Sequence, residues 1–130
     1  MANLDTVQLH AGQTPDRETH SRAMPVYQTT SYCYDDAAMA AGVFDGSVPG
    51  YTYTRIENPT VRALEERMTA IEEGAAAVCF ASGMAAISAA LYALCDHGDH
   101  IVAISTLYGG TYTLLGSRLP QVSDIRTTFV

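Results

Sequence analysis

Apolar side chains recur at helical spacing in the segment that follows residue 58. The stripe consists of Val61, Leu64, Met68 and Ile71. Asn58 can accept a hydrogen bond from the first turn, and Pro59 suits the first helical position. Gly74 suits a helix end. The pattern therefore predicts a helix that begins at Pro59 and is ended by Gly74.

Short apolar runs alternate with helical patterns from residue 75 onward. The predicted elements are a strand over Ala75–Phe80, a helix over Gly83–Leu94, a strand over Ile101–Ile104, a helix over Thr111–Leu119 and a strand over Asp124–Val130. This order predicts an α/β fold with a parallel sheet, in which ligands bind beyond the carboxyl ends of the strands. Ser82-Gly83 and Tyr108-Gly109-Gly110 fall at that edge. Because so few strands cannot complete a covered parallel sheet, we expect an incomplete domain.

The first 49 residues show no long periodic pattern. Turn-forming residues interrupt them at Pro15, Pro25, Gly42, Gly46 and Pro49. We therefore expect an extended arm. Long segments without strong elements more often wrap a partner or line a site than stay free, and an oligomer would explain this one.

Composition excludes some classes of function. The chain has 130 residues, 48% of them hydrophobic, which suffices for at most one globular domain. A formal net charge of -7 and a pI of about 4.8 argue against a nucleic-acid or anionic-membrane surface. The N-terminus has no cationic stretch followed by an apolar run, so no secretory signal is expected and the cytoplasm is the predicted location.

Two further patterns carry little chemistry. Ala75–Cys95 is uncharged and long enough for a membrane span, but Ala, Ser and Gly dominate it and Ser82-Gly83 interrupts it, so no span is expected. The three cysteines lie far apart, without the paired spacing of a zinc site, which indicates a reducing compartment and no metal centre.

A possible anion site begins at Ser82. Ser82 can cap the next helix, and Gly83 would let a ligand approach the free N–H groups of Gly83 and Met84 at the positive end of the helix dipole. A phosphate would suit this position. Taken alone, an ordinary serine-capped helix explains these residues better.

Tyr53 and Arg55 are two residues apart, so in an extended segment both side chains point to one face. A phenol and a guanidinium there could hold a phosphate at two points. Tyr51 would share that face and pack. For an isolated pair, a solvated strand with a surface arginine is the better interpretation.

Tyr108 falls in a strand-to-helix loop, where the following glycines leave room above its ring. The ring could stack on a flat cofactor and the hydroxyl could relay a proton. A half-buried loop aromatic without chemistry explains the residue equally well.

Three stretches together resemble one enzyme family. They are "SRAMPVYQTTSYCYDD", "YTYTRIENPTVRALEERMTAIEEGAAAVCFASGMAAI" and "STLYGGTY". They resemble the N-terminal third of the pyridoxal phosphate (PLP) enzymes of cysteine and methionine metabolism. That family includes cystathionine gamma-synthase, the cystathionine and methionine lyases, and O-acetylhomoserine sulfhydrylase. The arm and "LYGGTY" look most like the sulfhydrylases.

The resemblance implies a fold and a set of residue roles. The fold would be the start of the large domain of a type I, aspartate aminotransferase-like PLP enzyme, with residues 1–57 as an arm serving the neighbouring subunit and residues 58–130 as the first part of the PLP domain. Tyr53 and Arg55 would bind the cofactor phosphate of the neighbouring subunit, and Ser82, Gly83 and Met84 that of their own. Tyr108 would stack on the pyridine ring and assist proton transfer; Tyr108 and Tyr53 are the predicted catalytic residues.

The implied reaction is replacement of the acetate of O-acetylhomoserine by sulfide or a thiol, giving homocysteine or methionine. A cystathionine gamma-synthase or a cystathionine or methionine lyase is the alternative, although Gly110 stands where methionine gamma-lyases typically carry cysteine. The family suggests a homotetramer built from dimers that share active sites, acting on a small amino-acid substrate.

The chain contains no lysine: its seven basic residues are all arginine. In the family, a lysine forms the Schiff base with PLP. We therefore expect an N-terminal fragment that is inactive alone. A second hypothesis is a lysine-free subunit that binds a phosphate without catalysis.

Overall fold

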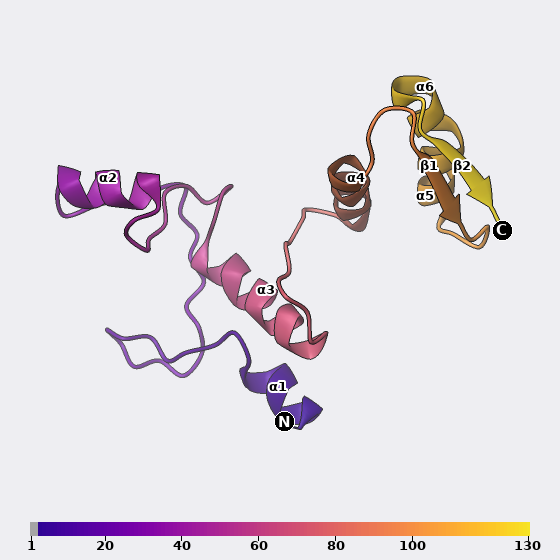
Figure 1. The fold of residues 1–130 in the computed structure, drawn as a ribbon. Helices are drawn as coiled ribbons and strands as arrows, with labels where there is room; N and C mark the ends of the chain where they lie inside the picture. Colours follow the sequence, from indigo (N-terminus) through magenta and orange to yellow (C-terminus); the bar gives the residue numbers. More distant parts are fainter. Residues whose placement is uncertain (1–2) are drawn as a thin grey trace. The chain divides into compact units, whose positions relative to one another are not determined.

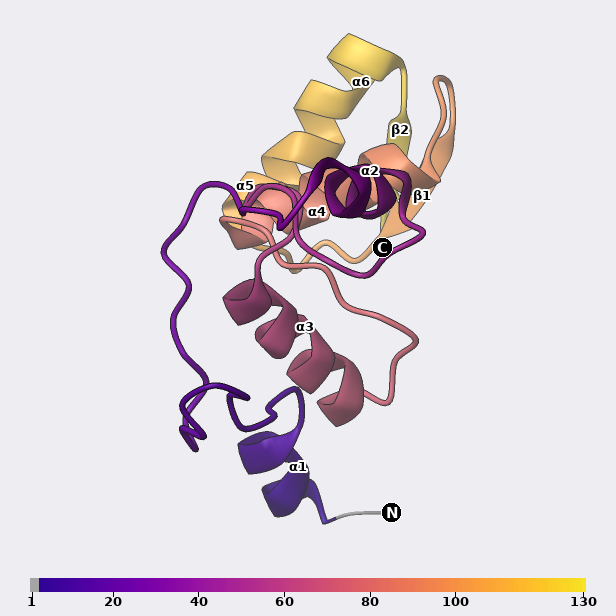
Figure 2. The ribbon, with the colours of Figure 1, turned by 90° about the vertical axis from the view of Figure 1, so that its left-hand side faces the viewer.

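The structure is a computed structural model that describes residues 3–130. The chain divides into two compact units, Met1–Cys79 and Phe80–Val130, drawn as a ribbon in Figure 1 and Figure 2. The predicted boundary after residue 57 concerns which subunit the arm serves, and it stays a prediction. In the described part of the chain, no helix is long and apolar enough to cross a membrane.

The first unit holds α1 (Leu4–His10), α2 (Ala37–Asp45) and α3 (Pro59–Ile71). The expectation of an arm without regular elements is wrong at α1 and α2. Each begins at a polar cap that the hydrophobic pattern does not reveal: Asn3 accepts a hydrogen bond from the backbone of Asp5, and Asp36 accepts one from Met39. Helix α1 packs on α3, and both views show them side by side.

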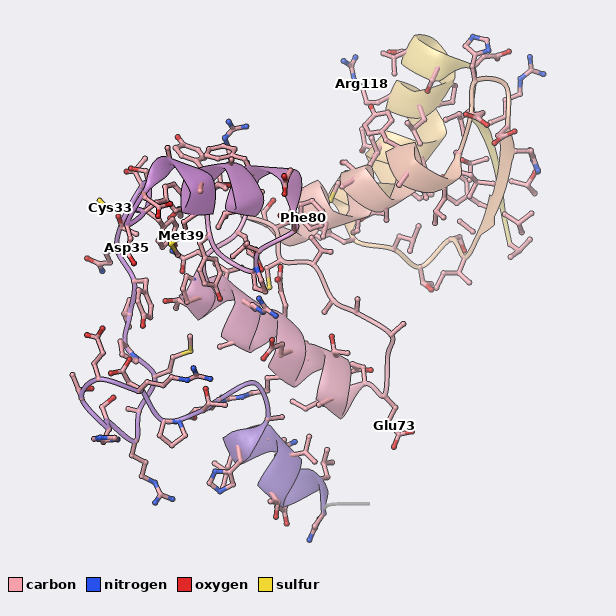
Figure 3. All side chains as sticks on the ribbon, turned by 60° about the vertical axis from the view of Figure 1, so that its left-hand side comes forward. Cys33, Asp35, Met39, Glu73, Phe80 and Arg118 are labelled. Carbon is pink, nitrogen blue, oxygen red and sulfur yellow. The ribbon has the colours of Figure 1, made fainter. Side chains whose placement is uncertain are left out.

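Helix α3 confirms the predicted start and corrects the predicted end. Asn58 caps it and Pro59 is its first residue. The last helical residue is Ile71, and Glu73, not Gly74, takes the left-handed conformation, with φ of 51°. Glu73 is exposed and points away from the helix in Figure 3.

The apolar stripe of α3 forms but is not buried within this chain. Val61, Leu64 and Met68 keep 40%, 50% and 39% of their surface exposed. Helix propensity and capping therefore define the helix here, while the burial that the stripe implies is not supplied by residues 3–130.

The strand predicted over Ala75–Phe80 is wrong. These residues run extended without pairing, and Val78 is 71% exposed. A strand exists only where a neighbouring strand accepts and donates its backbone hydrogen bonds. Here the N–H of Cys79 donates instead to the Glu65 carboxylate, with 2.8 Å between nitrogen and oxygen. The apolar run identified a segment suited to a sheet, but no strand in the described residues pairs with it.

The second unit follows the predicted alternation. Its elements are α4 (Gly83–Leu94), β1 (His100–Ala103), α5 (Gly109–Thr113), the π-helical stretch η1 (Leu114–Arg118), α6 (Leu119–Ser123) and β2 (Arg126–Phe129). The helix predicted over Thr111–Leu119 is part of one continuous helical segment that starts at Gly109 and runs to Ser123. Strands β1 and β2 pair in parallel, as predicted, with His100 opposite Arg126.

An apolar core fixes the second unit. Leu115, Leu119 and Ile125 are 5%, 0% and 1% exposed. They come from η1, from α6 and from the loop before β2, so they join the helical segment to the two-stranded sheet. The start of α5 is thereby held near the carboxyl end of β1, which is the edge where parallel sheets bind ligands.

Candidate functional site

The start of α4 has the features of an anion site. The Ser82 hydroxyl accepts a hydrogen bond from the backbone of Ala85 at 3.1 Å, which confirms the predicted cap. The first N–H groups of any helix lack a partner within the helix, so those of Gly83 and Met84 remain available. A β-carbon built on Gly83 would meet no atom within 4 Å. The backbone is therefore open to a ligand at the positive end of the helix dipole.

Tyr108 lies where the chain enters α5, and 75% of its surface is exposed. Gly110 sits directly against its ring: a β-carbon at position 110 would lie 2.8 Å from Tyr108 Cε1 and 3.4 Å from Met84 Sδ. A carbon cannot approach a ring atom that closely without displacing it. The ring therefore occupies this place because residue 110 is glycine.

Met84 joins the starts of α4 and α5. The hydroxyl of the buried Thr111 lies 3.5 Å from Met84 Sδ, close enough for a weak hydrogen bond. This contact holds the two helix starts together within the second unit. Ser82, Gly83, Met84 and Tyr108, which are four of the six predicted site residues, thus lie at these two helix starts and make up one candidate half-site.

Tyr53 and Arg55, the other two predicted site residues, lie in the first unit and make up a second candidate half-site. Tyr53 makes an antiparallel bridge with Ser31, but the chain then turns, because the N–H groups of Ile56 and Glu57 both donate to the Tyr53 carbonyl. The expected extended segment is therefore wrong beyond Tyr53. The turn still brings the two side chains together, with the Arg55 guanidinium carbon 5.3 Å from the Tyr53 ring centre.

Arg55 is available for an anion. Its side chain is exposed, and in the described part of the chain no carboxylate lies within ion-pair distance of it. Tyr51, in contrast, packs as expected: its ring centre lies 5.4 Å from that of Tyr32. The Tyr34 hydroxyl also donates to the Tyr51 carbonyl at 2.9 Å. Tyr51 therefore contributes to packing beside the half-site.

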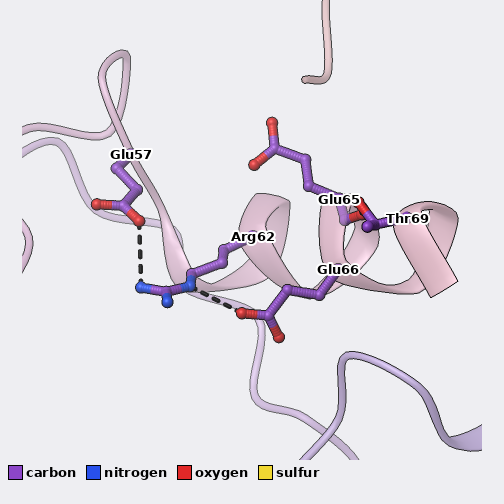
Figure 4. A network of polar contacts seen from close by, with 5 residues as sticks. All are labelled: Glu57, Arg62, Glu65, Glu66 and Thr69. Atoms are coloured by element: carbon purple, nitrogen blue, oxygen red, sulfur yellow. Dashed lines mark hydrogen bonds and ion pairs between the residues drawn. The ribbon is translucent and has the colours of Figure 1, made fainter. Parts of the chain in front are cut away.

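The carboxylates on and just before α3 contact groups other than Arg55, as Figure 4 shows for Arg62. Arg62 Nε lies 2.9 Å from Glu66, and Arg62 Nη1 lies 3.3 Å from Glu57. Glu66 is the main cause that raises the pKa of Arg62 above its usual value, so the guanidinium stays charged. Glu65 is half-buried, and its carboxylate accepts a hydrogen bond from the backbone N–H of Cys79.

A groove of about 620 Å³ lies along this side of α3, and its lining includes Glu57, Glu65, Glu66 and Glu73. Four carboxylates would repel a phosphate. The groove is therefore not the anion site. Among residues 3–130, no group of three potential ligands lies close enough to hold a metal ion.

The observed residues fit the groups of PLP. Its phosphate needs hydrogen-bond donors, which the open start of α4 and the free Arg55 guanidinium provide. Its flat ring needs a stacking surface, which the exposed Tyr108 ring provides. A lysine is not among the 130 residues, so the covalent attachment has to come from another polypeptide segment.

The structure also shows what sequence reasoning missed. Asn58, expected only as a helix cap, is 3% exposed and bonds to two parts of the arm. Gly110, noted only as a departure from the lyases, sets the place of the Tyr108 ring. The "ENP" sequence gave a signal for a cap but none for a tertiary contact.

Comparisons with known proteins identify relatives of this chain among enzymes of sulfur amino-acid metabolism. A homocysteine synthase from Schizosaccharomyces pombe is 48% identical over 128 residues, which are 98% of this chain and 30% of that protein. An O-acetyl-L-homoserine sulfhydrylase from Leptospira meyeri is 48% identical over 126 residues, which are 97% of this chain and 28% of that protein. The chain therefore spans about 30% of the length of the curated relatives it matches.

A solved structure confirms the fold class. It is a putative O-acetylhomoserine (thiol)-lyase from Campylobacter jejuni, described as carrying N'-pyridoxyl-lysine-5'-monophosphate. It matches with a TM-score of 0.88 and 34% identity over 99% of this chain and 31% of that one. The family model for "Cys/Met metabolism PLP-dependent enzyme" matches residues 5–130. This chain therefore belongs to the PLP-dependent enzymes of cysteine and methionine metabolism, as its motifs predicted.

Proposed function

We propose that this chain forms part of an enzyme that replaces the acetate of O-acetylhomoserine by sulfide or a thiol. In the sulfide reaction, the bond between the gamma carbon and the ester oxygen breaks and acetate leaves with the electron pair. A new carbon–sulfur bond then gives homocysteine; methanethiol would give methionine. The names of the relatives support the substrate, and the lysine-free chain supports a lysine supplied from outside these 130 residues.

One observation supports the proposal most: the open start of α4 lies beside the exposed ring of Tyr108. PLP supplies an electron sink for the negative charge that develops when the substrate loses a proton. The N–H groups of Gly83 and Met84, with Ser82, would hold the phosphate. Tyr108 would stack on the ring, and its hydroxyl would carry a proton near the leaving group.

We further propose that Tyr53 and Arg55 bind the phosphate of a neighbouring subunit. Such sharing would require a homo-oligomer, and the family resemblance favours a tetramer assembled from two dimers. The arm would then have its function in the assembly. We also propose a cytoplasmic location without nucleic-acid or membrane partners, which the net charge of -7 supports.

Gly110 favours the sulfhydrylase over the methionine lyases. A cysteine at this position would place its β-carbon 2.8 Å from the Tyr108 ring as the ring now lies. Tyr108 would have to move, and the space around the substrate side chain would change. Cystathionine gamma-synthase remains the second candidate, since the same half-sites would serve it.

The first test uses the holoenzyme, that is, these 130 residues together with the polypeptide that supplies the lysine. We expect it to convert O-acetylhomoserine and sulfide to homocysteine and acetate. Activity on cystathionine or methionine alone would overturn the proposed reaction. If the 130-residue chain by itself is monodisperse and binds PLP reversibly, the non-catalytic phosphate-binding subunit is the better description.

The second test concerns the phosphate contacts. Arg55→Ala should weaken PLP binding by the holoenzyme by about 10- to 100-fold, because charge-assisted hydrogen bonds contribute about 1.5–3 kcal/mol. Arg17→Ala, at another exposed arginine of the first unit, is the matched control and should leave the affinity unchanged. Titration of the cofactor-free enzyme with PLP measures the affinity of each variant. Equal affinities for the two variants would remove Arg55 from the site.

A further inference from the structure

Hydrogen bonds join two distant segments of the first unit around the Tyr53–Arg55 half-site. Residues 27–31 run beside residues 53–60, and the contacts between them are largely polar. The backbone N–H of Tyr27 donates to the Thr60 hydroxyl at 2.9 Å. The N–H of Thr54 donates to the Thr30 carbonyl, also at 2.9 Å. Residues 27–31 are therefore bonded directly to the segment that would bind the phosphate.

Asn58 lies at the centre of these contacts. It is 3% exposed. Its side-chain oxygen accepts from the N–H of Thr60 at 2.8 Å, which is the capping bond of α3. Its side-chain nitrogen donates to the Tyr27 carbonyl at 3.0 Å and to the Thr54 hydroxyl at 3.1 Å. The amide thus uses its acceptor for the helix and its donors for the arm.

Capping alone does not require asparagine. Serine, threonine and aspartate cap helices as well, because only an acceptor is needed. The NH2 group of the Asn58 amide, with its two N–H donors, is therefore the feature that distinguishes it from the other capping residues. Both of its acceptors lie in a part-buried environment, where a missing donor is costly.

Thr54 transmits the effect of Asn58 to the half-site. It lies between Tyr53 and Arg55, and its hydroxyl accepts from Asn58 while donating to the carbonyl of Thr29. The backbone and the side chain of Thr54 are thus both held. The directions in which its two neighbours project depend on this residue.

We propose that Asn58 is a positioning residue for cofactor binding, whose amide donors fix Thr54 and thereby aim Tyr53 and Arg55 at a phosphate. The inference rests on the proposed function, and it adds a residue that does not touch the cofactor. Asn58 would contribute to phosphate affinity only through its neighbours.

The test is Asn58→Ser in the holoenzyme. Serine keeps a capping acceptor but loses the amide NH2 group, and its single, shorter hydroxyl cannot replace both bonds, so α3 should persist while the half-site loosens. We expect the affinity for PLP to fall about tenfold, and the affinity for pyridoxal, which lacks the phosphate, to change less than about twofold. Asn3→Ser is the matched control: Asn3 caps α1, and its bond goes to Asp5 within that helix, so both affinities should stay unchanged.

A double-mutant cycle separates positioning from general damage. In the Arg55→Ala background, Asn58→Ser should weaken PLP binding by less than about twofold, because residues that act through one contact are not additive. Thr54→Val, which keeps the shape but removes the hydroxyl, should repeat the loss confined to PLP and serves if Asn58→Ser does not fold. Equal losses for PLP and pyridoxal, or full additivity with Arg55→Ala, would overturn the inference.

The same experiment distinguishes the two proposals. If Arg55→Ala leaves PLP affinity unchanged, the phosphate role of the arm is wrong. If Arg55→Ala weakens PLP binding and neither Asn58→Ser nor Thr54→Val does, the phosphate role holds and the positioning role is wrong.

Discussion

Each of the two units is stabilised internally by a different kind of interaction. In the second unit, three aliphatic side chains from η1, α6 and the loop before β2 form a closed core. Among the described residues of the first unit, the buried side chains are Val43 and the polar Asn58, and many of the long-range contacts are hydrogen bonds to backbone atoms. The half-site with Tyr108 therefore depends on apolar packing, whereas the half-site with Arg55 depends on directional polar contacts.

This difference predicts how each unit responds to substitution. Apolar cores lose stability through cavities, and the loss spreads over the elements that share the core. Polar contacts act locally, because each bond fixes one backbone position. Amide hydrogen exchange of the holoenzyme, followed segment by segment, would reveal both behaviours.

The largest effect is expected from Leu119→Ala. Leu119 is fully buried, so its truncation should destabilise the second unit by about 2–5 kcal/mol, the range for such changes in protein cores. Exchange should accelerate throughout Gly109–Ser123 and β2, with a lower melting temperature. Leu94→Ala, at a leucine that is 82% exposed on α4, is the matched control and should cost far less. An effect on the first unit equal to that on the second would contradict the comparison.

Gly12→Ala should give an intermediate effect confined to the first unit. Gly12 has φ of 68°, and a β-carbon there would overlap the carbonyl oxygen of Ala63 on α3. Left-handed backbone costs a non-glycine residue about 1–3 kcal/mol, and the overlap adds to that cost. The residues around Gly12 are held by Arg67, whose Nε donates to the Ala11 carbonyl at 2.9 Å. We expect faster exchange in α1 and unchanged exchange in α5 and α6.

Gly46→Ala separates the cost of the left-handed backbone from the cost of the steric overlap. Gly46 has a similar φ of 79°, but its β-carbon would meet nothing within 4 Å. It should show the backbone cost alone, at the end of α2. If Gly12→Ala costs no more than Gly46→Ala, the close packing of the arm on α3 does not contribute to stability.

The contrast between apolar packing in the second unit and polar contacts in the first also explains how much of the fold could be predicted from the sequence. Periodicity reports burial, so it predicted α4, the parallel strands and the helix after Tyr108, which apolar packing organises. It missed α1 and α2, whose starts depend on the short polar caps Asn3 and Asp36. It also assigned a strand to Ala75–Phe80, because an apolar run indicates suitability for a sheet and not the presence of a neighbour.

The site could be predicted only in part for a related reason. Residue type and spacing indicated a capped helix start at Ser82 and a donor pair at Tyr53 and Arg55, since both are local features. The contacts of Asn58 with Tyr27 and Thr54 span 31 and 4 residues, and the longer one depends on how the arm returns to α3. No local pattern encodes that return.

The smallest effect is expected at the ion pairs of Arg62. Arg62 and Glu66 are four residues apart on α3, but both side chains are about half exposed, which limits the coupling to about 0.3–0.5 kcal/mol. The order is also the less favourable one, with the cation first and close to the positive end of the helix dipole. Arg62→Gln alone should therefore change the stability of the first unit by less than about 0.5 kcal/mol, even though two carboxylates contact the side chain. A double-mutant cycle with Glu66→Gln measures the coupling, which should shrink in 1 M salt because exposed charges are screened there. A coupling above about 1 kcal/mol that persists in salt would show that the first unit is stabilised by charge as well as by directed hydrogen bonds to the backbone.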